Sequence, residues 1–390
     1  MNTVEDVWAL IDREVKALPL ERVRLDQSPG RTLGEAIVAD ADMPEFSRSS
    51  IDGFALAENA PAGSYRVVGE VKPGAPAAAG PELGEAFKIY TGSALPEAGV
   101  GLVMVEDATL EGETLTTKVT SSTELIRVRA SQMEKGETLL PAGMPILPAA
   151  VTLLATVGAS APLVSHRPSA IHLVTGSEIV SVESTPAAGQ IRDSNSSLIL
   201  AMLSEAGADR VGHYHTTESI EDGLAALSSA EADLFLISGG ASVGAYDGTA
   251  EMLHRLGFTI HSSKVKSRPG KPLIFATRGS QTAFGLPGNP LAHFVCFHLF
   301  VRRTIDLMAG RAPQQRVLVA IDGPPPQPDP RETWWPAIVR ADQGMLVALP
   351  LPWVDSSDLS GIPLANALLR VSSQPTNGLV EALLFGSLQA

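Results

Sequence analysis

The chain has 390 residues, of which 44% are hydrophobic and 18% charged, and its formal net charge is −14. This length exceeds one ordinary hydrophobic core, so two to four domains are expected. The acidic balance argues against nucleic acid or an anionic membrane as a partner. One cysteine excludes an internal disulfide and a thiolate metal cage. No apolar run approaches the roughly 18 residues of a membrane span, and residues 1–6 do not resemble a signal peptide, so a soluble cytoplasmic protein is predicted.

The first predicted element is an amphipathic helix. Thr3 and Asp6 have the spacing of a capping box. Apolar residues then recur at helical spacing from Val4 to Leu18, and Pro19 ends the run.

Short β-type runs between Gly and Pro turns occupy residues 43–130 and predict a small β-rich domain. The clearest runs lie at residues 65–68, 87–90 and 102–105. Residues 131–165 are mixed and predict a connecting element.

From residue 171 strand-like runs alternate with helical patterns, which predicts a parallel, doubly wound α/β sheet. The strand-like runs lie at residues 171–174, 211–214 and 234–237, and the helices begin near residues 193, 219 and 289. After Arg316 the pattern is β-like again, which predicts a C-terminal β-domain. The predicted fold class is α/β plus β. The predicted domains are residues 1–42 with 131–165, 43–130, 166–312 and 313–390.

Three Gly- and Pro-rich loops lie in the α/β half, at residues 238–247, 268–272 and 286–290. Loops of this kind place amide N–H groups at the carboxyl edge of a sheet, where phosphates bind. Lys264, Lys266, Arg268 and Lys271 form a basic cluster near the second loop and favour an anionic ligand. A tight turn explains any one loop equally well, and such a cluster is often a solvated face, but three loops together favour a binding site.

Acidic residues beside turns are candidate ligands for Mg²⁺, which prefers oxygen donors. They are Asp52, Glu106, Asp107, Glu178 and Asp247. For each of them a turn or solvated role is an equally good interpretation. The eight histidines are predicted to be structural, and Cys296 to be a small buried hydrophobe.

Ten segments together resemble the molybdopterin molybdenumtransferase family, which includes the C-terminal part of gephyrin. Among them are Phe-Ser-Arg-Ser-Ser-Ile-Asp-Gly-Phe-Ala at residues 46–55 and Tyr-Thr-Gly-Ser-Ala-Leu-Pro at residues 90–96. The others lie at residues 30–44, 103–107, 141–143, 175–178, 193–195, 238–247, 269–272 and 286–290. Each segment is modest alone, but the ordered set is highly specific.

The resemblance implies an activity and an architecture. Such enzymes insert molybdate into adenylylated molybdopterin and release AMP and the molybdenum cofactor, with Mg²⁺ present. It also implies an elongated homodimer with a molybdopterin-binding α/β domain, a barrel-like C-terminal domain and a dimerisation role for residues 1–42 and 131–165. The active site would lie between one subunit's β-rich domain and the other's α/β domain. Apo-molybdoenzymes or their chaperones would receive the product.

The resemblance also assigns residues. The implied catalytic positions are Asp52, Thr91, Glu178 and Asp247, with Asp52, Glu178 and Asp247 as metal ligands. The implied substrate-binding positions are Asp233, Gly239, Gly240, Ser242, Arg268, Lys271, Pro287, Gly288 and Asn289.

Two segments depart clearly from the family pattern, and a third, residues 80–86, has few of the family's usual features. Ala130-Ser131-Gln132 stands where the family usually has Gly-Glu-Asp, and Trp334-Trp335-Pro336 replaces an expected Arg-rich strand. Both departures favour an alternative function, a diverged carrier or scaffold that binds molybdopterin without inserting metal. The joint presence of the four implied catalytic residues favours the transferase.

Overall fold

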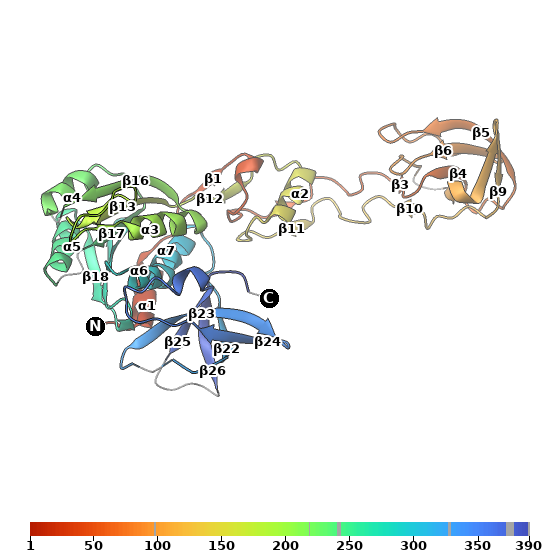
Figure 1. Cartoon of the computed structure of the whole chain (residues 1–390). Coiled ribbons are helices and arrows are strands. Elements are labelled where there is room, and N and C mark those ends of the chain that lie inside the picture. The colour runs from red at the N-terminus through yellow and green to blue at the C-terminus, as the bar shows by residue number, and fades with distance from the viewer. Residues whose placement is uncertain (97–98, 218, 240–242, 327–328, 372–377, 389–390) are drawn as a thin grey trace. The chain divides into compact units, whose positions relative to one another are not determined.

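The chain forms two compact units in a computed structural model, which describes residues 1–96, 99–217, 219–239, 243–326, 329–371 and 378–388 (Figure 1). Unit 1 consists of Met1–Arg22, Gly30–Thr32 and Leu163–Ala390. Unit 2 consists of Val23–Pro29 and Leu33–Pro162 and therefore contains the whole predicted β-rich domain. The finer division into four domains stays a prediction.

Unit 2 is built around a six-stranded sheet with the order β7-β4-β6-β5-β9-β8. Its strands are β4 (Gly53–Ala57), β5 (Ser64–Val71), β6 (Glu85–Ile89), β7 (Val100–Met104), β8 (Ala108–Glu111) and β9 (Thr114–Thr117). The three runs predicted from the sequence correspond to β5, β6 and β7, so these predictions are confirmed.

The rest of unit 2 consists of short paired strands and helical turns. The strand pairs are β2 (Ile37–Val38) with β11 (Thr138–Leu140), and β3 (Arg48–Ser49) with β10 (Ile126–Arg127). The helical elements are η1 (Leu25–Gln27), η2 (Val105–Asp107) and α2 (Pro148–Thr156). Helix α2 was not predicted from the sequence, because its N-cap residue Leu147 offers no side-chain capping bond.

Unit 1 begins with the predicted amphipathic helix, α1 (Val4–Glu14). Its capping box is confirmed: the backbone N–H of Asp6 donates to Thr3 Oγ1 over 3.1 Å, and that of Thr3 donates to the Asp6 carboxylate over 2.8 Å. Val4, Val7 and Ile11 are fully buried. The helix therefore docks through the apolar stripe that its sequence predicts.

A six-stranded sheet with the order β16-β13-β17-β21-β20-β18 forms the α/β part of unit 1. The four strands from β16 to β21 are parallel, whereas β20 is antiparallel to both of its neighbours. The all-parallel prediction is therefore wrong for β20, which runs against the other five strands, because β20 and β21 form a hairpin that turns at Gly279 with φ 59°. The strands are β13 (Ser169–Thr175), β16 (Asp209–Thr216), β17 (Leu234–Gly239), β18 (Thr259–Lys264), β20 (Pro272–Arg278) and β21 (Gln281–Leu286).

Helices cover both faces of this sheet, as a doubly wound fold requires. On one face α3 and α6 pack against residues such as Leu234 and Leu236, and on the other α4 and α5 pack against Ile171 and Leu173. The helices are α3 (Ser194–Glu205), α4 (Ile220–Leu227), α5 (Val243–Arg255) and α6 (Pro290–Cys296). The last continues through a π-helical turn (Phe297–Val301) into α7 (Arg302–Met308).

The C-terminal part of unit 1 is a closed five-stranded barrel, because the ladder β23-β24-β22-β26-β25 returns to β23. Its strands are β22 (Arg316–Ile321), β23 (Glu332–Asp342), β24 (Met345–Pro350), β25 (Ala367–Val371) and β26 (Leu379–Leu384), with the short helix η4 (Ile362–Leu364) before β25. Trp334-Trp335-Pro336 belongs to β23, with Trp334 fully buried.

Helix α1 lies between the helical layer and the barrel (Figure 1). Trp8 meets Trp334 edge to face with ring centroids 6.0 Å apart, and the guanidinium of Arg370 in β25 pairs with Glu5. The first residues of the chain therefore join two parts of unit 1. Two short strand pairs complete the unit: β1 (Leu20–Arg22) with β12 (Leu163–Ser165), and β14 (Ile179–Val180) with β15 (Ile191–Arg192).

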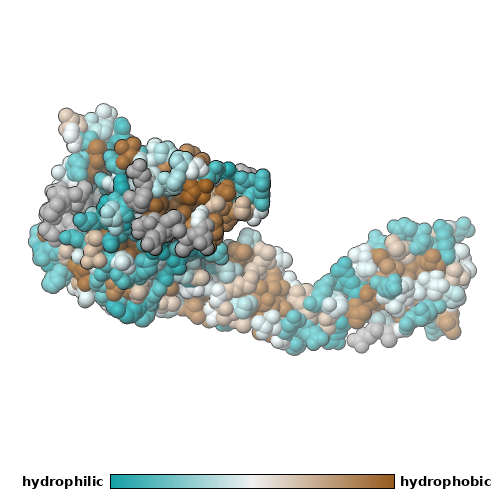
Figure 2. All heavy atoms as spheres, turned by 90° about the horizontal axis from the view of Figure 1, so that it is seen from below, coloured by the Kyte–Doolittle hydropathy of each residue, from teal (hydrophilic) through white to brown (hydrophobic). Residues whose placement is uncertain are grey.

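Hydrophobic and hydrophilic residues are interspersed over the face shown in Figure 2. The exposed large hydrophobic side chains include Leu318 and Met345 on barrel strands. Such a mixed surface is ordinary for folded domains and does not mark a binding site. Among the described residues, the helices are too short or too polar to cross a bilayer.

Candidate functional site

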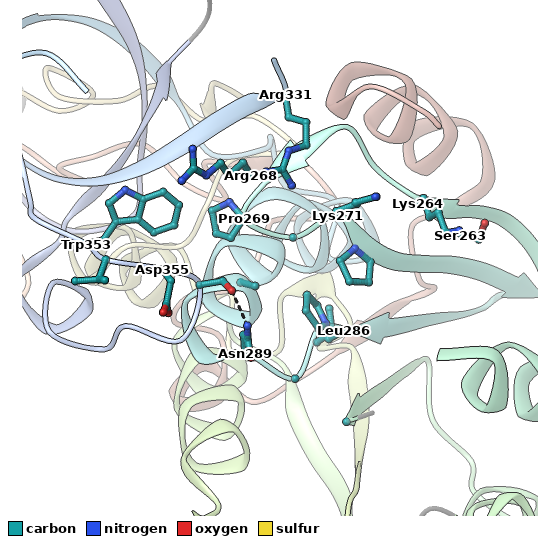
Figure 3. A pocket seen from close by; sticks show the side chains of 18 of the residues that line it. Ser263, Lys264, Arg268, Pro269, Lys271, Leu286, Asn289, Arg331, Trp353 and Asp355 are labelled. Carbon is teal, nitrogen blue, oxygen red and sulfur yellow. Dashed lines mark hydrogen bonds between the residues drawn. The ribbon is translucent and has the colours of Figure 1, made fainter. Parts of the chain in front are cut away.

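A pocket of about 770 Å³ opens in unit 1 at the carboxyl edge of the sheet. Its walls come from all three predicted loops and from the segment after β24 (Figure 3). Of the implied substrate-binding residues, six line it: Gly239, Arg268, Lys271, Pro287, Gly288 and Asn289. The fold therefore gathers at one place residues that are spread over about 50 positions of the sequence.

The first loop enters the pocket at Gly239, the last residue of β17. Gly239 has φ 135°, and a Cβ atom there would lie 2.2 Å from the carbonyl oxygen of Thr175 on the neighbouring strand. Only glycine fits this backbone. Gly240 and Ser242 lie outside the described residues.

The second loop carries the basic residues and connects to the barrel. Strand β19 (Ser267–Arg268) pairs in parallel with the start of β23, so Arg268 lies opposite Thr333. The guanidinium of Arg268 donates to Asp329 over 2.8 Å. Asp329 also accepts from the backbone N–H and the guanidinium of Arg331, and these bonds lower the pKa of the Asp329 carboxyl. One carboxylate therefore orients two arginines at the pocket.

The third loop opens α6, but its amide groups are already used. The backbone N–H groups of Leu291 and Ala292 donate to the carbonyl oxygen of Ser356 over 3.1 and 3.4 Å. The side chain of Asn289 donates to Ser356 Oγ over 2.5 Å instead of capping its own helix. In this structure the helix start therefore holds a protein loop rather than presenting these amides to a phosphate.

The pocket has a basic character. Among its described lining residues, Lys264, Arg268, Lys271 and Arg331 are basic and Asp355 is acidic. Lys264 and Lys271 are exposed, and neither pairs with an acidic side chain within the described part of the chain. In a protein with a net charge of −14, these cations reverse the local field and favour an anionic ligand.

Sequence reasoning missed the part of the pocket that the barrel region supplies. Arg331, Trp353, Asp355 and Ser356 all line it. The available signals were weak: Arg331 follows a Pro-rich segment, and Trp353 is one of only four tryptophans in the chain. Neither signal says which distant loop the residue meets.

Unit 2 brings together two further predicted residues, Asp52 and Thr91. The backbone N–H and the hydroxyl of Thr91 donate to Asp52 Oδ1 over 2.7 and 2.9 Å. Both bonds lower the pKa of the exposed Asp52 carboxyl, and the bond from the backbone N–H has the larger effect. The 3-10 turn η2 with Glu106 and Asp107 adjoins this pair, because the N–H of Val105 donates to the carbonyl oxygen of Asp52. Asp52 is thus an accessible carboxylate, and its Oδ2 accepts no hydrogen bond from the residues that the structure describes.

The remaining predicted residues have different positions. Glu178 is exposed in the turn after β13, three residues beyond the strand end that pairs with Gly239. Asp247 lies in the first turns of α5, but its side chain lies outside the described part of the structure. Asp233 does not reach the pocket: it precedes β17 and accepts from the N–H and hydroxyl of Ser169, at the opposite end of the sheet. Within the described residues, no group of three His, Cys, Asp or Glu side chains is placed to hold a metal ion.

Two histidines of neighbouring strands are in hydrogen-bond contact, the buried His172 of β13 and the exposed His213 of β16. His172 Nε2 lies 2.7 Å from Ser238 Oγ, and its Nδ1 lies 3.2 Å from His213 Nδ1. Burial lowers the pKa of His172 well below its ordinary value and that of His293 to about 4. Cys296 is buried as predicted, and burial raises the pKa of its thiol.

Comparison with known proteins finds one family along most of the chain. Residues 2–158 match the MoeA N-terminal region (domain I and II), and residues 171–306 match a family described as a probable molybdopterin binding domain. The molybdopterin molybdenumtransferase of Bacillus subtilis is 31% identical over 367 residues, covering 90% of this chain and 85% of that protein. The enzyme of the same name from Staphylococcus epidermidis is 32% identical over 301 residues, covering 74% of this chain and 71% of that protein.

Solved structures show the same fold. A molybdopterin biosynthesis MoeA protein from Pyrococcus horikoshii superposes with a TM-score of 0.78 at 22% identity, covering 99% of this chain and 100% of that chain. A molybdenum cofactor biosynthesis protein from Pyrococcus furiosus gives a TM-score of 0.60 at 17% identity, covering 99% and 100%. The multi-domain α/β plus β class is thereby confirmed.

Proposed function

Since the chain belongs to the molybdopterin molybdenumtransferase family, we propose that it acts in molybdenum cofactor biosynthesis and inserts molybdate into adenylylated molybdopterin with release of AMP. The observation that carries this proposal is the basic pocket at the carboxyl edge of the α/β sheet. Adenylylated molybdopterin bears phosphate groups and molybdate is an oxyanion, so both substrates need the local positive field that this pocket provides.

The residues of the pocket fit such substrates in different ways. Lys264 and Lys271 are compact, mobile cations that can attract and hold an oxyanion. Arg268 is already oriented by Asp329, so its remaining N–H groups are presented to a ligand with little loss of side-chain freedom. Gly239 lines the pocket at the sheet edge, and we propose that a phosphate of the substrate binds beside it.

Asp52 is proposed to supply the carboxylate chemistry. Its lowered pKa keeps it ionised at neutral pH, and Thr91 holds one oxygen while the other is free for a ligand. Carboxylate oxygens suit Mg²⁺, and we propose that each of Asp52, Glu178 and Asp247 acts as a Mg²⁺ ligand. Bound Mg²⁺ would neutralise charge on the phosphate groups.

The test follows both products of the reaction. Purified protein is supplied with adenylylated molybdopterin, Mg²⁺ and low molybdate, and AMP release and activation of an apo-molybdoenzyme are measured. Both should appear, and chelation of Mg²⁺ should stop them. Asp247→Asn should abolish insertion but retain pterin binding.

Two lysines give a matched comparison for the pocket. Lys271→Ala should raise the substrate concentration needed for half-maximal rate about tenfold or more, because it removes a charge from the lining. Lys266→Ala, which alters an exposed lysine that does not line the pocket, should leave the rate unchanged. Pterin binding without AMP release would instead favour a non-catalytic carrier.

The family resemblance also suggests assembly and location. We propose a homodimer in the cytoplasm that delivers its product to apo-molybdoenzymes or their chaperones. Light scattering on the purified protein tests the dimer directly.

A further inference from the structure

We propose that Trp353 determines which ligands the pocket accepts, by stacking against a planar nitrogen heterocycle at the end of the pocket away from the lysines. The inference rests on the proposed function, because adenylylated molybdopterin carries two such rings, adenine and the pterin, beside its phosphates. The shared chemistry is a flat heteroaromatic ring joined to an anionic group.

The pocket has two chemically different ends. Figure 3 shows Trp353 on one side, pointing toward Pro269 and Arg268, and Lys264 and Lys271 on the other. Trp353 is half-buried and lines the pocket, so part of its indole is available to a ligand. An aromatic surface attracts a flat ring, whereas the lysine end attracts an oxyanion.

The indole of Trp353 is held in place before any ligand arrives. Its ring meets that of Trp335 edge to face, with centroids 5.0 Å apart and planes at 75°. Trp335 is fixed in turn, because its Nε1–H donates to the carbonyl oxygen of Leu351 over 2.6 Å. The guanidinium carbon of Arg268 lies 5.5 Å from the Trp353 ring centroid. Two neighbours therefore restrict the ring.

The loop that carries Trp353 is fastened at both ends. On one side the N–H of Leu351 donates to the carbonyl oxygen of Pro336 in β23 over 2.9 Å. On the other side Ser356 accepts from the start of α6 and from Asn289. A wall fixed in this way loses little conformational freedom when a ligand binds, so a stacking contact contributes to affinity with little ordering cost.

The residues of β23 that depart from the family pattern support the wall formed by Trp353. Trp335 and Pro336, which stand where an Arg-rich strand is expected, are the residues that support Trp353 and Leu351. The segment removes expected positive charge but builds an aromatic wall. The pocket is therefore adapted to recognise a ring as well as an anion.

Direct binding measurements on the full chain test the proposal. Calorimetric titrations use AMP, the free pterin neopterin and sodium molybdate as separate probes. The proteins are the unchanged chain, Trp353→Ala, Trp353→Phe and the matched control Leu359→Ala, which alters a residue that is 45% exposed and follows Trp353 by six positions. Thermal unfolding of each variant checks that the fold is retained.

Trp353→Ala should weaken a ring-bearing probe roughly tenfold or more, the range of one stacked base, and leave molybdate binding within about twofold. Trp353→Phe should retain most of the affinity, and Leu359→Ala all of it. A loss confined to AMP assigns the wall to adenine, and a loss confined to neopterin assigns it to the pterin.

Equal binding of both ring probes to the unchanged chain and to Trp353→Ala would overturn the proposal, as would failure of the unchanged chain to bind either. A parallel loss of molybdate binding would also overturn it, because it would show that the loop shapes the whole pocket. The proposed function fails differently, through absence of AMP release and active cofactor, and ring selectivity at Trp353 would survive that result.

Discussion

The pocket of unit 1 and the Asp52–Thr91 pair of unit 2 are built by different physical means. The pocket is assembled from segments of an α/β sheet and a barrel that are far apart in the sequence, and its loops are fixed by close backbone contacts and shared ion pairs. The Asp52–Thr91 pair needs only two hydrogen bonds and lies exposed on a small β-unit. An extensive framework suits binding, which requires many contacts, whereas one ionised carboxylate is sufficient for a chemical step.

The sharpest test of this contrast is Asp52→Asn. The amide keeps the shape and can accept from Thr91, but it loses the negative charge. We expect metal insertion to fall about 10²–10³-fold in single-turnover AMP release. Binding of AMP in unit 1 should stay within about twofold of its original affinity. The control Glu111→Gln, an exposed acid at the end of β8, should change neither. A large loss of AMP affinity in Asp52→Asn would contradict the separation of binding in unit 1 from chemistry at Asp52.

Gly270→Ala should instead destabilise the fold of unit 1 around the pocket. Gly270 has φ 99°, and a Cβ there would lie 2.6 Å from the Cys296 sulfur. We expect the free energy of unfolding of unit 1 to fall by about 2–4 kcal/mol. Hydrogen exchange measures this loss at the amides of unit 1, and the exchange rates of the unit 2 amides should not change.

Two variants separate the causes at Gly270. Gly270→Ala with Cys296→Ala should recover the steric part of the loss but not the backbone part. Gly279→Ala, with φ 59° and open space around it, should cost only about 1–2 kcal/mol. Equal losses at both glycines would show that the Cys296 contact is unimportant.

Acid should weaken unit 1 through His298. Burial lowers the pKa of His298 to about 3, from an ordinary value of 6.5. Between these values the unfolded chain binds a proton that the folded chain does not, so stability falls as the pH drops from 6.5 toward 3. His298→Phe should flatten this dependence by up to about 1.4 kcal/mol per pH unit. Phenylalanine suits the position because His298 stacks on Phe385 at 4.1 Å and its Nδ1 is buried without a partner in the described structure.

The exposed His254 provides the control for this titration. His254→Gln should leave the dependence of unfolding on pH unchanged. Denaturant unfolding between pH 4 and 7 measures both variants. If the free energy of unfolding of His298→Phe depended on pH as steeply as that of the unchanged chain, His298 would not be the source of the acid sensitivity.

Ala130→Gly should give the smallest effect, a gain in unit 2. Ala130 has φ 61°, a left-handed conformation that costs a side chain about 1–2 kcal/mol. Glycine removes this cost but adds freedom to the unfolded chain, so we expect a net gain of about 0.5 kcal/mol. Ala142→Gly, at an exposed turn residue outside the left-handed region, should lose a similar amount. Thermal unfolding compares the two, and a loss in both would contradict the prediction.

Local signals made much of the fold predictable from the sequence. The capping box at Thr3 and the helix starts near residues 193 and 219 depend on signals within a few residues, and each is confirmed. The alternating pattern after residue 171 likewise predicted β13, β16 and β17. Helix α2 was missed because it begins at Pro148 without a polar cap, and the β20–β21 hairpin because two apolar runs do not specify their direction.

The candidate site was predictable only where its residues lie in sequence motifs. Arg268, Lys271 and Asn289 meet because strand ends share one edge of the sheet, a consequence of topology. Arg331 and Trp353 reach the same pocket through barrel closure and the β19–β23 pairing, which link segments about 65 residues apart. Asp233, a substrate-binding prediction, instead joins two strand starts, because its carboxylate meets Ser169.

The position of α1 between the helical layer and the barrel has a consequence for biosynthesis. Its docking partners include Trp334 and Arg370, which leave the ribosome long after Val4, Val7 and Ile11. Unit 2 is largely contiguous in sequence, so it can fold before the residues that pack against the apolar stripe of α1 have been synthesised. The apolar stripe of α1 therefore acquires its full set of contacts only after the C-terminal residues of the chain have been synthesised.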